Sequence, residues 1–321
     1  MDLIYTDAQR IDQGVLSAYA FDMSFGADEN DFEMVLGKSE PTLEFGAFAY
    51  IEGTEYGGTI DGVKTVTDGE SITYSGRTWH GILNSKVLQP DSGEDYLVVS
   101  GDANAVLDTL IDRIGVGGLF TAEATEAGIN ISNYQFHRYC KAYDGIRAML
   151  ADNDAKLKIE WKDKSVYLSA VPVVDYTEAP VDGDVATLTV EQFAKKVNHL
   201  ICLGRGELAD REVVHLYVNA NGVISETQTF TGLAEVADVY DNSNAESVAD
   251  LKKEGKERLA ELRGIDKAEI ALPERNGIVY DIGDIVGATD IRTGVSVAAI
   301  VSQKIVKINN GAVVTEYKTG G

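Results

Sequence analysis

Cysteine is scarce in this sequence: 321 residues contain only Cys140 and Cys202. The two lie far apart, and each is flanked by apolar or aromatic residues. Small domains held together by disulfides carry several cysteines at close spacing, so a disulfide framework is excluded. We expect both thiols to be free and buried, in a protein made in the cytoplasm.

Basic residues are also scarce. Lys and Arg number 28 against 52 Asp and Glu, which gives a formal net charge of −24. Such a surface repels phosphate backbones and anionic membranes, and this argues against sequence-specific nucleic-acid binding. Two explanations of the charge stay open: it keeps the protein soluble, or it forms a wall past which a polyanion slides.

Long apolar segments are missing as well. No stretch approaches the roughly 20 apolar residues that a membrane-spanning helix needs. The opening segment, MDLIYTDAQRID, has neither the basic start nor the apolar core of a signal peptide. We therefore expect no membrane partner. The 44% of hydrophobic residues suffices for packed cores, and a chain of this length should form two to four domain-like units.

Residues for metal binding and catalysis show no pattern. The four histidines, His80, His137, His199 and His215, have no partner at a metal-ligand spacing, and there is no Cys-x-x-Cys. No Gly-x-Ser-x-Gly elbow occurs, and nothing selects an acid–base pair for glycoside hydrolysis among 52 carboxylates. We expect no catalytic residue, no metal and no cofactor, and hence a protein that is not an enzyme.

One glycine-rich segment could suggest a nucleotide-binding loop, because Leu203-Gly204-Arg205-Gly206-Glu207 follows a predicted strand. The third glycine of that motif is missing, and the next residues lead into another strand. No helix N-terminus would therefore be present to hold phosphate. A tight turn between two strands is the favoured interpretation.

Residues 1–100 predict an N-terminal β domain, a small barrel or sandwich. Gly, Asn and Asp form frequent turns, as in Asp28-Glu29-Asn30-Asp31, and no helical period appears. Short segments rich in aromatic and β-branched residues predict strands between these turns. The segments are Tyr19–Phe25, Phe32–Leu36, Phe45–Ile51, Gly57–Val66, Glu70–Gly76 and Tyr96–Ser100.

Residues 101–180 predict a small α+β domain. Apolar residues recur at helical spacing over 103–114, with Asp102 as the N-cap and Gly115 after the end. A second helix is expected over 143–152. The alternating segments Lys156–Trp161 and Ser165–Val171 then predict a strand pair joined by a charged turn.

Residues 181–321 predict a second β domain with a helical excursion at 245–263. A short helix is expected to begin at Thr189, which could form a capping box with Gln192. The fold class is therefore mainly β with an α+β insertion: two tube-like barrels or sandwiches plus a small α+β domain. The strands expected here are His199–Leu203, Glu212–Val218, Thr227–Phe230 and further strands from Ala268 to Tyr317, with turns at Asn276-Gly277 and Asn309-Asn310-Gly311.

The densest motif is Gly76-Arg77-Thr78-Trp79-His80-Gly81. Glycines on both sides let the backbone bend tightly, the tryptophan can anchor the bend, and the arginine can pair with carboxylates. A barrel corner is the plain structural interpretation of the motif.

Three segments, taken in order, resemble the tail-hub family of long-tailed phages, the siphophage tail proteins often described as prophage tail proteins. The first contains Gly76, Arg77, Trp79 and Gly81 after Gly57-Gly58-Thr59-Ile60. The second runs from Val197 through Gly204, Gly206, Glu207 and Arg211 to Tyr217, and the third is Ile282-Gly283-Asp284-Ile285-Val286-Gly287 followed by Val301–Ile308. In this family such residues shape the fold, and the resemblance supplies no catalytic set.

The resemblance implies a homotrimer in which each chain gives two related β domains to a pseudo-sixfold ring. The ring would join the tail tube and the distal tail protein ring to a tail fibre or receptor-binding protein, beside the tape-measure protein. It implies a location in the virion tail after synthesis in the host cytoplasm. Because many relatives continue into a fibre or wall-degrading domain and this sequence ends at Gly320-Gly321, we expect neither activity here.

A tail ring would also give the net charge a role, because genomic DNA must pass through the channel without binding to it. We expect a net negative inner face, supplied by acidic clusters such as Asp28–Asp31, Asp91–Asp95 and Asp182–Asp184, with the basic Lys252–Arg263 stripe facing outward. Two alternatives stay open. One is a cell-wall-degrading tail enzyme, a glycosidase or a peptidase, and the other is a carbohydrate-binding module that displays a row of aromatic side chains.

Overall fold

A computed structural model gives the fold and describes residues 1–178, 181–182, 187–191, 196–219, 222–245, 247–263, 267–273, 278–289, 294 and 296–320. The chain divides into two compact units. The first unit comprises residues 1–188 and 269–320, and the second comprises residues 189–268. The first unit is therefore discontinuous in sequence.

Strands dominate both units, which confirms the mainly β class with small α-helical insertions. The helices are α1 Trp79–Asn84, α2 Ala103–Arg113, α3 Ala142–Ala151 and α4 Val248–Arg263, with short 3-10 turns η1 Leu208–Asp210 and η2 Gly232–Ala234. The strands of the first half are β1 Leu3–Thr6, β2 Asp12–Leu16, β3 Tyr19–Gly26, β4 Asp31–Gly37, β5 Phe48–Tyr50, β6 Gly57–Thr65, β7 Ser71–Thr78, β8 Val87–Leu88, β9 Val98–Asp102, β10 Phe120–Ala122, β11 Asn130–Gln135, β12 Cys140–Lys141, β13 Ala155–Lys162 and β14 Ser165–Pro172. Those of the second half are β15 Val181–Asp182, β16 Thr187–Glu191, β17 His199–Leu203, β18 Val213–Val218, β19 Ile224–Ser225, β20 Ala237–Asp241, β21 Lys267–Pro273, β22 Ile285–Thr289, β23 Ser296–Asn309 and β24 Ala312–Gly320.

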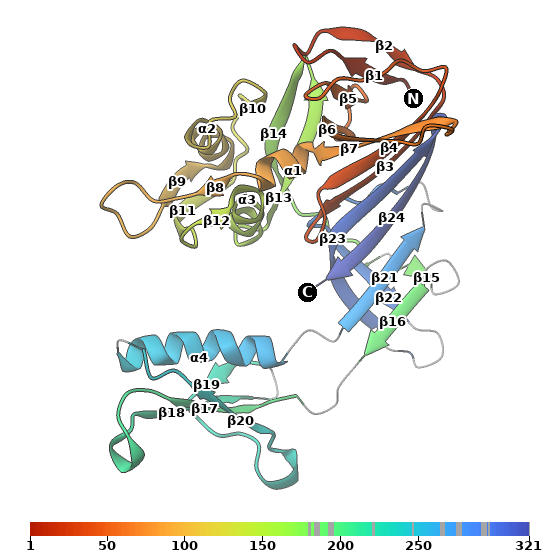
Figure 1. The fold of residues 1–321 in the computed structure, drawn as a ribbon. Coiled ribbons are helices and arrows are strands. Elements are labelled where there is room, and N and C mark those ends of the chain that lie inside the picture. Colours follow the sequence, from red (N-terminus) through yellow and green to blue (C-terminus); the bar gives the residue numbers. More distant parts are fainter. Residues whose placement is uncertain are drawn as a thin grey trace. The chain divides into compact units, whose positions relative to one another are not determined.

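The largest sheet joins the two ends of the chain. Its strand order is β16-β21-β24-β23-β3-β4-β7-β6-β5-β1-β2, with β22 paired to β23 and β15 to β22. Figure 1 shows the red N-terminal strands beside the blue C-terminal ones, where β3 pairs antiparallel with β23 and Phe21 lies opposite Ile308. Apolar residues alternate with polar ones along these strands, so one face is buried around Phe21, Phe25 and Met34. The C-terminal strands thus complete the β sheet that the N-terminal strands begin.

Residues 87–172 form an α+β insertion in the first unit. Helices α2 and α3 pack with the sheet β10-β14-β13, and the apolar residues of α2, such as Leu107 and Leu110, are fully buried. Asp102 caps α2 by accepting a hydrogen bond from the Asn104 amide at 3.0 Å. The core of this insertion is continuous with Phe48 and Trp79 of the β region, so the insertion does not fold around a core of its own.

The second unit is a four-stranded sheet, β19-β18-β17-β20, with α4 packed on one face. Leu200, Cys202 and Leu216 of the sheet lie against Leu251 and Leu259 of the helix. A glycine stands at position 255 because a Cβ there would lie 2.5 Å from the Cys202 sulfur. The close approach of helix and sheet therefore depends on one glycine in the helix.

Most elements agree with the sequence patterns. The helices predicted over 103–114, 143–152 and 245–263 are confirmed as α2, α3 and α4, and the turn at Asn309-Asn310-Gly311 joins β23 to β24. The predicted turn Asn276-Gly277 lies outside the described residues.

Three predictions of secondary structure were wrong. Thr189 does not begin a helix but lies inside β16, where the β-branched residues of Thr187–Glu191 favour a strand over the capping-box signal. Thr227–Phe230 is not a strand, because the amide of Thr227 turns back to the Ser225 hydroxyl at 3.3 Å and the strand ends there. The motif Gly76-Arg77-Thr78-Trp79-His80-Gly81 was expected to form only a barrel corner, but helix α1 begins inside it at Trp79.

Candidate functional site

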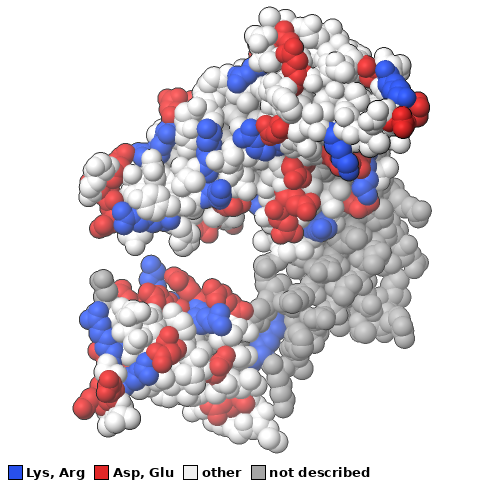
Figure 2. Space-filling model, in the orientation of Figure 1, with Lys and Arg blue, Asp and Glu red and all other residues white. Residues whose placement is uncertain are grey.

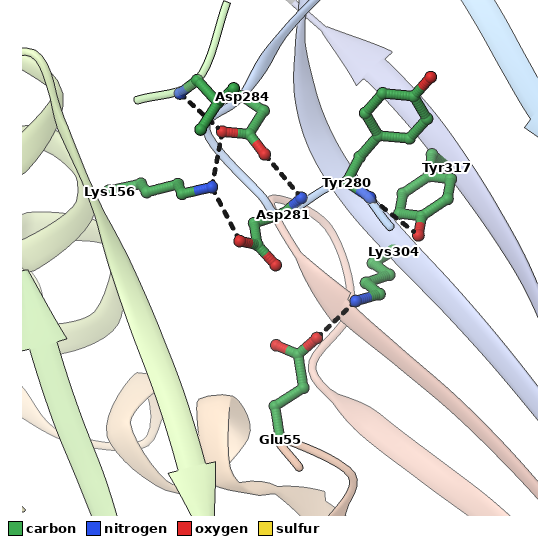
Figure 3. Close-up of polar contacts among 8 residues, drawn as sticks. Glu55, Lys156, Tyr280, Asp281, Asp284, Lys304 and Tyr317 are labelled. Atoms are coloured by element: carbon green, nitrogen blue, oxygen red, sulfur yellow. Dashed lines mark hydrogen bonds and ion pairs between the residues drawn. The ribbon is translucent and has the colours of Figure 1, made fainter. Parts of the chain in front are cut away.

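A buried polar site in the first unit surrounds Asp284, in the turn before β22 (Figure 3). Its carboxylate is fully buried, and one oxygen lies 2.6 Å from the Lys156 ammonium on β13. The same oxygen accepts a hydrogen bond from the Val174 amide at 3.0 Å, and the other oxygen accepts one from the Asp281 amide at 2.9 Å. Lys156 also pairs with the Asp281 carboxylate at 2.8 Å. Asp284 therefore ties the C-terminal β strands to the α+β insertion.

Gly283 makes this site possible. Its φ of +101° is a backbone conformation that L side chains rarely adopt, and a Cβ there would lie 2.9 Å from the Cβ of Lys156. The Gly283 amide donates to the Val301 carbonyl at 2.8 Å, which anchors the turn on β23. In the third sequence motif, Gly283 thus lets the turn lie close to Lys156, and Asp284 supplies the buried carboxylate that pairs with that lysine.

Electrostatics favour the charged form of Lys156. Burial by itself lowers the pKa of Lys156, but hydrogen bonds and charge attraction from Asp281 and Asp284 outweigh it, so the pKa is raised. The two oxygens of Asp284 accept from three donors, the Lys156 ammonium and the amides of Val174 and Asp281. These bonds hold β13, the segment after β14 and the turn before β22 together.

A second buried ion pair lies nearby, between Lys304 on β23 and Glu55 before β6 (Figure 3). The Lys304 side chain is 2% exposed and its ammonium lies 2.7 Å from one Glu55 oxygen. The other oxygen faces Nε2 of His80 at 3.5 Å. Burial would raise the pKa of Glu55, but Lys304 and then His80 outweigh it and lower that pKa to about 2. Glu55 therefore stays ionised, the opposite of what a general acid requires.

The Glu55 pair gives a pH-dependent prediction. A carboxyl whose folded pKa lies below its ordinary value of 4.5 stabilises the fold above pH 4.5, and this stability is lost as the pH falls toward 2. Between pH 5.5 and 3.5 we expect wild type to lose roughly 1.4 kcal/mol of unfolding free energy more than Glu55→Gln loses. Urea titrations followed by tryptophan fluorescence measure this, since both tryptophans lie in the first unit.

The control for that measurement is Glu94→Gln, which changes an exposed carboxylate in the loop before β9. Its pH dependence should match that of wild type. If Glu55→Gln also showed the wild-type pH dependence, the ion pair would not contribute to acid stability.

The first motif lies where β7 ends and α1 begins. Cβ atoms at Gly76 and Gly81 would lie 1.8 and 2.0 Å from the carbonyl oxygens of Thr59 and Asn30, so only glycine fits at either place. The Arg77 guanidinium forms a bidentate salt bridge with the Asp61 carboxylate, with N–O distances of 2.7 and 2.9 Å. The resulting close packing positions Trp79, the first residue of α1.

Trp79 connects the β region to the insertion. Its ring is fully buried, stacks on Trp161 of β13 with ring centroids 5.0 Å apart, and meets Phe48 edge-on at 5.3 Å. Thr78 caps α1 by accepting a hydrogen bond from the Gly81 amide at 3.2 Å, which fixes the start of the helix that carries Trp79. The tryptophan is therefore a packing element shared by two parts of one unit.

The second motif forms the turn between β17 and β18 in the second unit. The Gly204 amide donates to the Glu212 carbonyl at 2.8 Å, and the Glu212 amide donates to the Arg205 carbonyl at 2.8 Å. Gly206 has φ of +96°, and Glu207 precedes η1. The Arg211 side chain donates to the Gly204 carbonyl at 3.0 Å and pairs with Asp241. A 3-10 turn of three residues follows in place of a helix, so the loop has no helix N-terminus for phosphate.

The three motifs occupy different elements of the fold. Gly76, Arg77, Trp79 and Gly81 shape the junction of β7 with α1, Gly283 and Asp284 form the turn before β22, and the remaining four belong to the second unit. Sequence reasoning missed Lys156, Lys304 and Glu55, the buried partners. Alternation gave a signal only for Lys304, which shares a strand face with the buried Val306 and Ile308. Along β13 it places Lys156 with Lys158 on the polar face, so the burial of Lys156 could not be predicted in this way.

The described residues contain no group of three His, Cys, Asp or Glu side chains that could hold a metal ion. His199 does lie between Glu235 and His215, with Nδ1 2.6 Å from a Glu235 oxygen and Nε2 2.8 Å from Nδ1 of His215. Both cysteines are free thiols, with Cys202 buried and Cys140 partly exposed. In the part of the chain that the structure describes, no helix is long and apolar enough to cross a membrane.

The acidic clusters lie at the surface. Asp28, Glu29 and Asp31 are exposed, and so is the whole of the 91–95 loop, whereas part of the 182–184 cluster lies outside the described residues. Figure 2 shows acidic and basic side chains interspersed on the visible face of each unit. Lys253, Lys256 and Arg258 of α4 are exposed to solvent.

No protein-family model matches the sequence, and no curated protein matches it. Solved structures do match it over the whole length. The 43 kDa tail protein of prophage MuSo2 from Shewanella oneidensis has 11% identity and a TM-score of 0.60, covering 99% of this chain and 98% of that one. Prophage tail protein gp18 from Listeria monocytogenes EGD-e has 12% identity and a TM-score of 0.58, covering 100% and 95%.

A chain in the Phage P2 baseplate, in its activated conformation with Ca, has 10% identity and a TM-score of 0.50, covering 100% of this chain and 99% of that one. At such low identities the likeness shows a shared fold. This chain thus shares its fold with these two prophage tail proteins and with the baseplate chain.

Proposed function

We propose that this chain is a structural subunit of the tail of a phage, a prophage or a tail-like particle. In that tail it would form the hub ring between the tail tube with its distal tail ring and the tip or fibre. The observation that carries the proposal is the correspondence in fold, over almost the whole of each chain, with two prophage tail proteins and a baseplate chain. The sequence motifs are a second support, because Gly283 and Asp284, quoted for the family resemblance, form a turn whose buried carboxylate pairs with Lys156.

The ring is a homotrimer in this proposal. Three chains that each bring two β regions give six near-equivalent positions, which match a sixfold tube. The distal tail protein, the tape-measure protein and a tail fibre or receptor-binding protein are the partners that such a position implies. The chain's location is then the virion tail.

Exposed leucines support an assembled state. Leu208 in η1 is 95% exposed and Leu233 in η2 is 91% exposed, each at the tip of a loop in the second unit. Large apolar side chains at loop tips cost solubility unless another surface covers them. They fit a subunit that is covered by its neighbours in the particle.

The net charge of −24 fits a channel for DNA. A wall rich in Lys and Arg would bind phosphates in a salt-dependent way, whereas an acidic wall repels the duplex over about 8–10 Å at physiological salt. We propose that the inner face of the ring is net negative and that the Lys252–Arg263 stripe faces outward. The exposed clusters at Asp28–Asp31 and Asp91–Asp95 are candidates for that inner face.

The two alternatives have less support. Both tryptophans are buried in the first unit and are not available to stack on a sugar, which weakens the carbohydrate-binding alternative. The alternative of a wall-degrading enzyme would need a general acid, but Glu55 has its pKa lowered and is paired with Lys304. A reproducible cleared band on a peptidoglycan zymogram would favour the enzyme instead.

Sedimentation equilibrium of the purified chain tests the oligomeric state. We expect the mass to rise with concentration from that of one 34.6 kDa chain toward three chains. Association should strengthen between low and high salt, because like charges on the subunits repel less when screened. A limiting mass of two or six chains would contradict the trimer.

A further inference from the structure

In the second unit, helix α4 packs on only one face of the sheet β19-β18-β17-β20 (Figure 1). Side chains alternate between the two faces along each strand, so the neighbours of the helix-packed Leu200, Cys202 and Leu216 point to the opposite face. Val213 and Val239 on that face are 47% and 56% exposed. We call the opposite face the open face, and strand register places its residues in two adjacent rows, Val239-Ile201-His215 and Asp241-Leu203-Val213.

The acids of the open face are balanced locally. Asp241 pairs with Arg211, and a Glu235 oxygen beside the face lies 2.6 Å from Nδ1 of His199. The chain as a whole has a formal net charge of −24, so two copies repel each other wherever their unpaired acids meet. On the open face that repulsion is absent. A strongly charged partner would gain little there, whereas an uncharged apolar group of another acidic chain would fit.

The same unit presents such an apolar group on the loop that joins β17 to β18. Leu208 in that loop is 95% exposed and has φ of +51°, a backbone conformation that L side chains rarely adopt. Hydrogen bonds hold the loop in place, from the Gly204 amide to the Glu212 carbonyl at 2.8 Å and from Arg211 to the Gly204 carbonyl at 3.0 Å. A leucine that is held in solvent at a strained backbone position is preorganised to enter another apolar surface.

We propose that Leu208 of one copy packs on the open face of a second copy, next to Ile201 and Val239. A contact between two different surfaces is heterologous, and contacts of this kind form a ring when the rotation from copy to copy closes. The inference rests on the proposed homotrimeric ring and names a contact through which its subunits meet. It also agrees with association that strengthens with salt, because salt screens the repulsion between acidic chains and leaves an uncharged contact intact.

The test uses two variants of the full chain. Leu208→Ser removes the apolar side chain from the loop, and Val239→Glu places a charge on the open face. In sedimentation equilibrium, each variant alone should associate at least about tenfold more weakly than wild type. Mixed in equal amounts, the two should recover a complex of two chains. In that complex, Leu208 of the Val239→Glu chain meets the intact open face of the Leu208→Ser chain, which only a heterologous contact allows.

The matched control is Val248→Glu, which places the same charge on a 40% exposed valine of α4 and should leave association unchanged. A circular dichroism spectrum like that of wild type will show that each variant is folded. The proposal is overturned if either Leu208→Ser or Val239→Glu associates as wild type does, if their mixture recovers no complex, or if wild type does not self-associate. A wild-type mass that still rises to three chains in the first two cases would leave the ring standing with a different contact. Cryo-electron microscopy of the parent particle tests the ring itself separately.

Discussion

Replacing Asp284 with alanine is expected to lower the free energy of unfolding of the first unit by about 3–5 kcal/mol, because the Lys156 ammonium would be left buried without its closest partner. The change also removes the acceptor for the amides of Val174 and Asp281. Urea unfolding followed by tryptophan fluorescence reports on this unit alone, since Trp79 and Trp161 both belong to it.

The matched control is Asp281→Ala, which removes the second carboxylate on the same lysine. Its side chain is 47% exposed, so water can replace it and the expected loss is about 1 kcal/mol or less. The double variant Lys156→Met with Asp284→Leu should recover part of the loss, because an apolar pair no longer leaves a charge unpaired. If Asp284→Ala and Asp281→Ala lost equal free energies of unfolding, the burial of Asp284 would not explain its contribution to stability.

Trp79→Ala is expected to cost about 3–5 kcal/mol in the same measurement, with Trp161 as the remaining fluorophore. The indole fills the junction between the β region and the insertion, and its removal leaves a cavity beside Phe48 and Trp161. Because the β region and the insertion share this core, we expect them to unfold together in one transition.

Phe45→Ala serves as the control for that variant. Phe45 is an exposed aromatic residue before β5, and its truncation should change stability by about 0.5 kcal/mol or less. A loss for Trp79→Ala as small as that for Phe45→Ala would contradict the role of the indole at the junction.

Local patterns in the sequence were sufficient for much of the fold. Helix α2 follows from Asp102 as a cap and from apolar residues three and four positions apart, and its bounds agree with the prediction within a residue. Strands β3, β4, β5, β6, β7 and β9 follow from alternation and turn chemistry, whereas β1, β2 and β8 were not predicted. Helix α1 is only six residues long, too short for a helical period to be seen.

Long-range pairing was beyond such patterns. β3 and β23 meet across almost the whole chain, and Lys156 meets Asp284 across 128 positions. Neither residue type nor period specifies a partner at that distance, so whether the domains are continuous in sequence could not be predicted. The family resemblance did draw attention to Gly283 and Asp284, but the reason for them, a buried lysine on another strand, required the structure.

The hub ring is tested most directly by cryo-electron microscopy of the parent particle. We predict three copies of this chain in a ring at the distal end of the tail tube, with a net negative channel wall and α4 on the outside. Six copies, one copy, or a position away from the tail tip would contradict the proposal. A trimer with a neutral or basic channel would leave the ring intact but would overturn the explanation of the −24 charge as a surface for DNA passage.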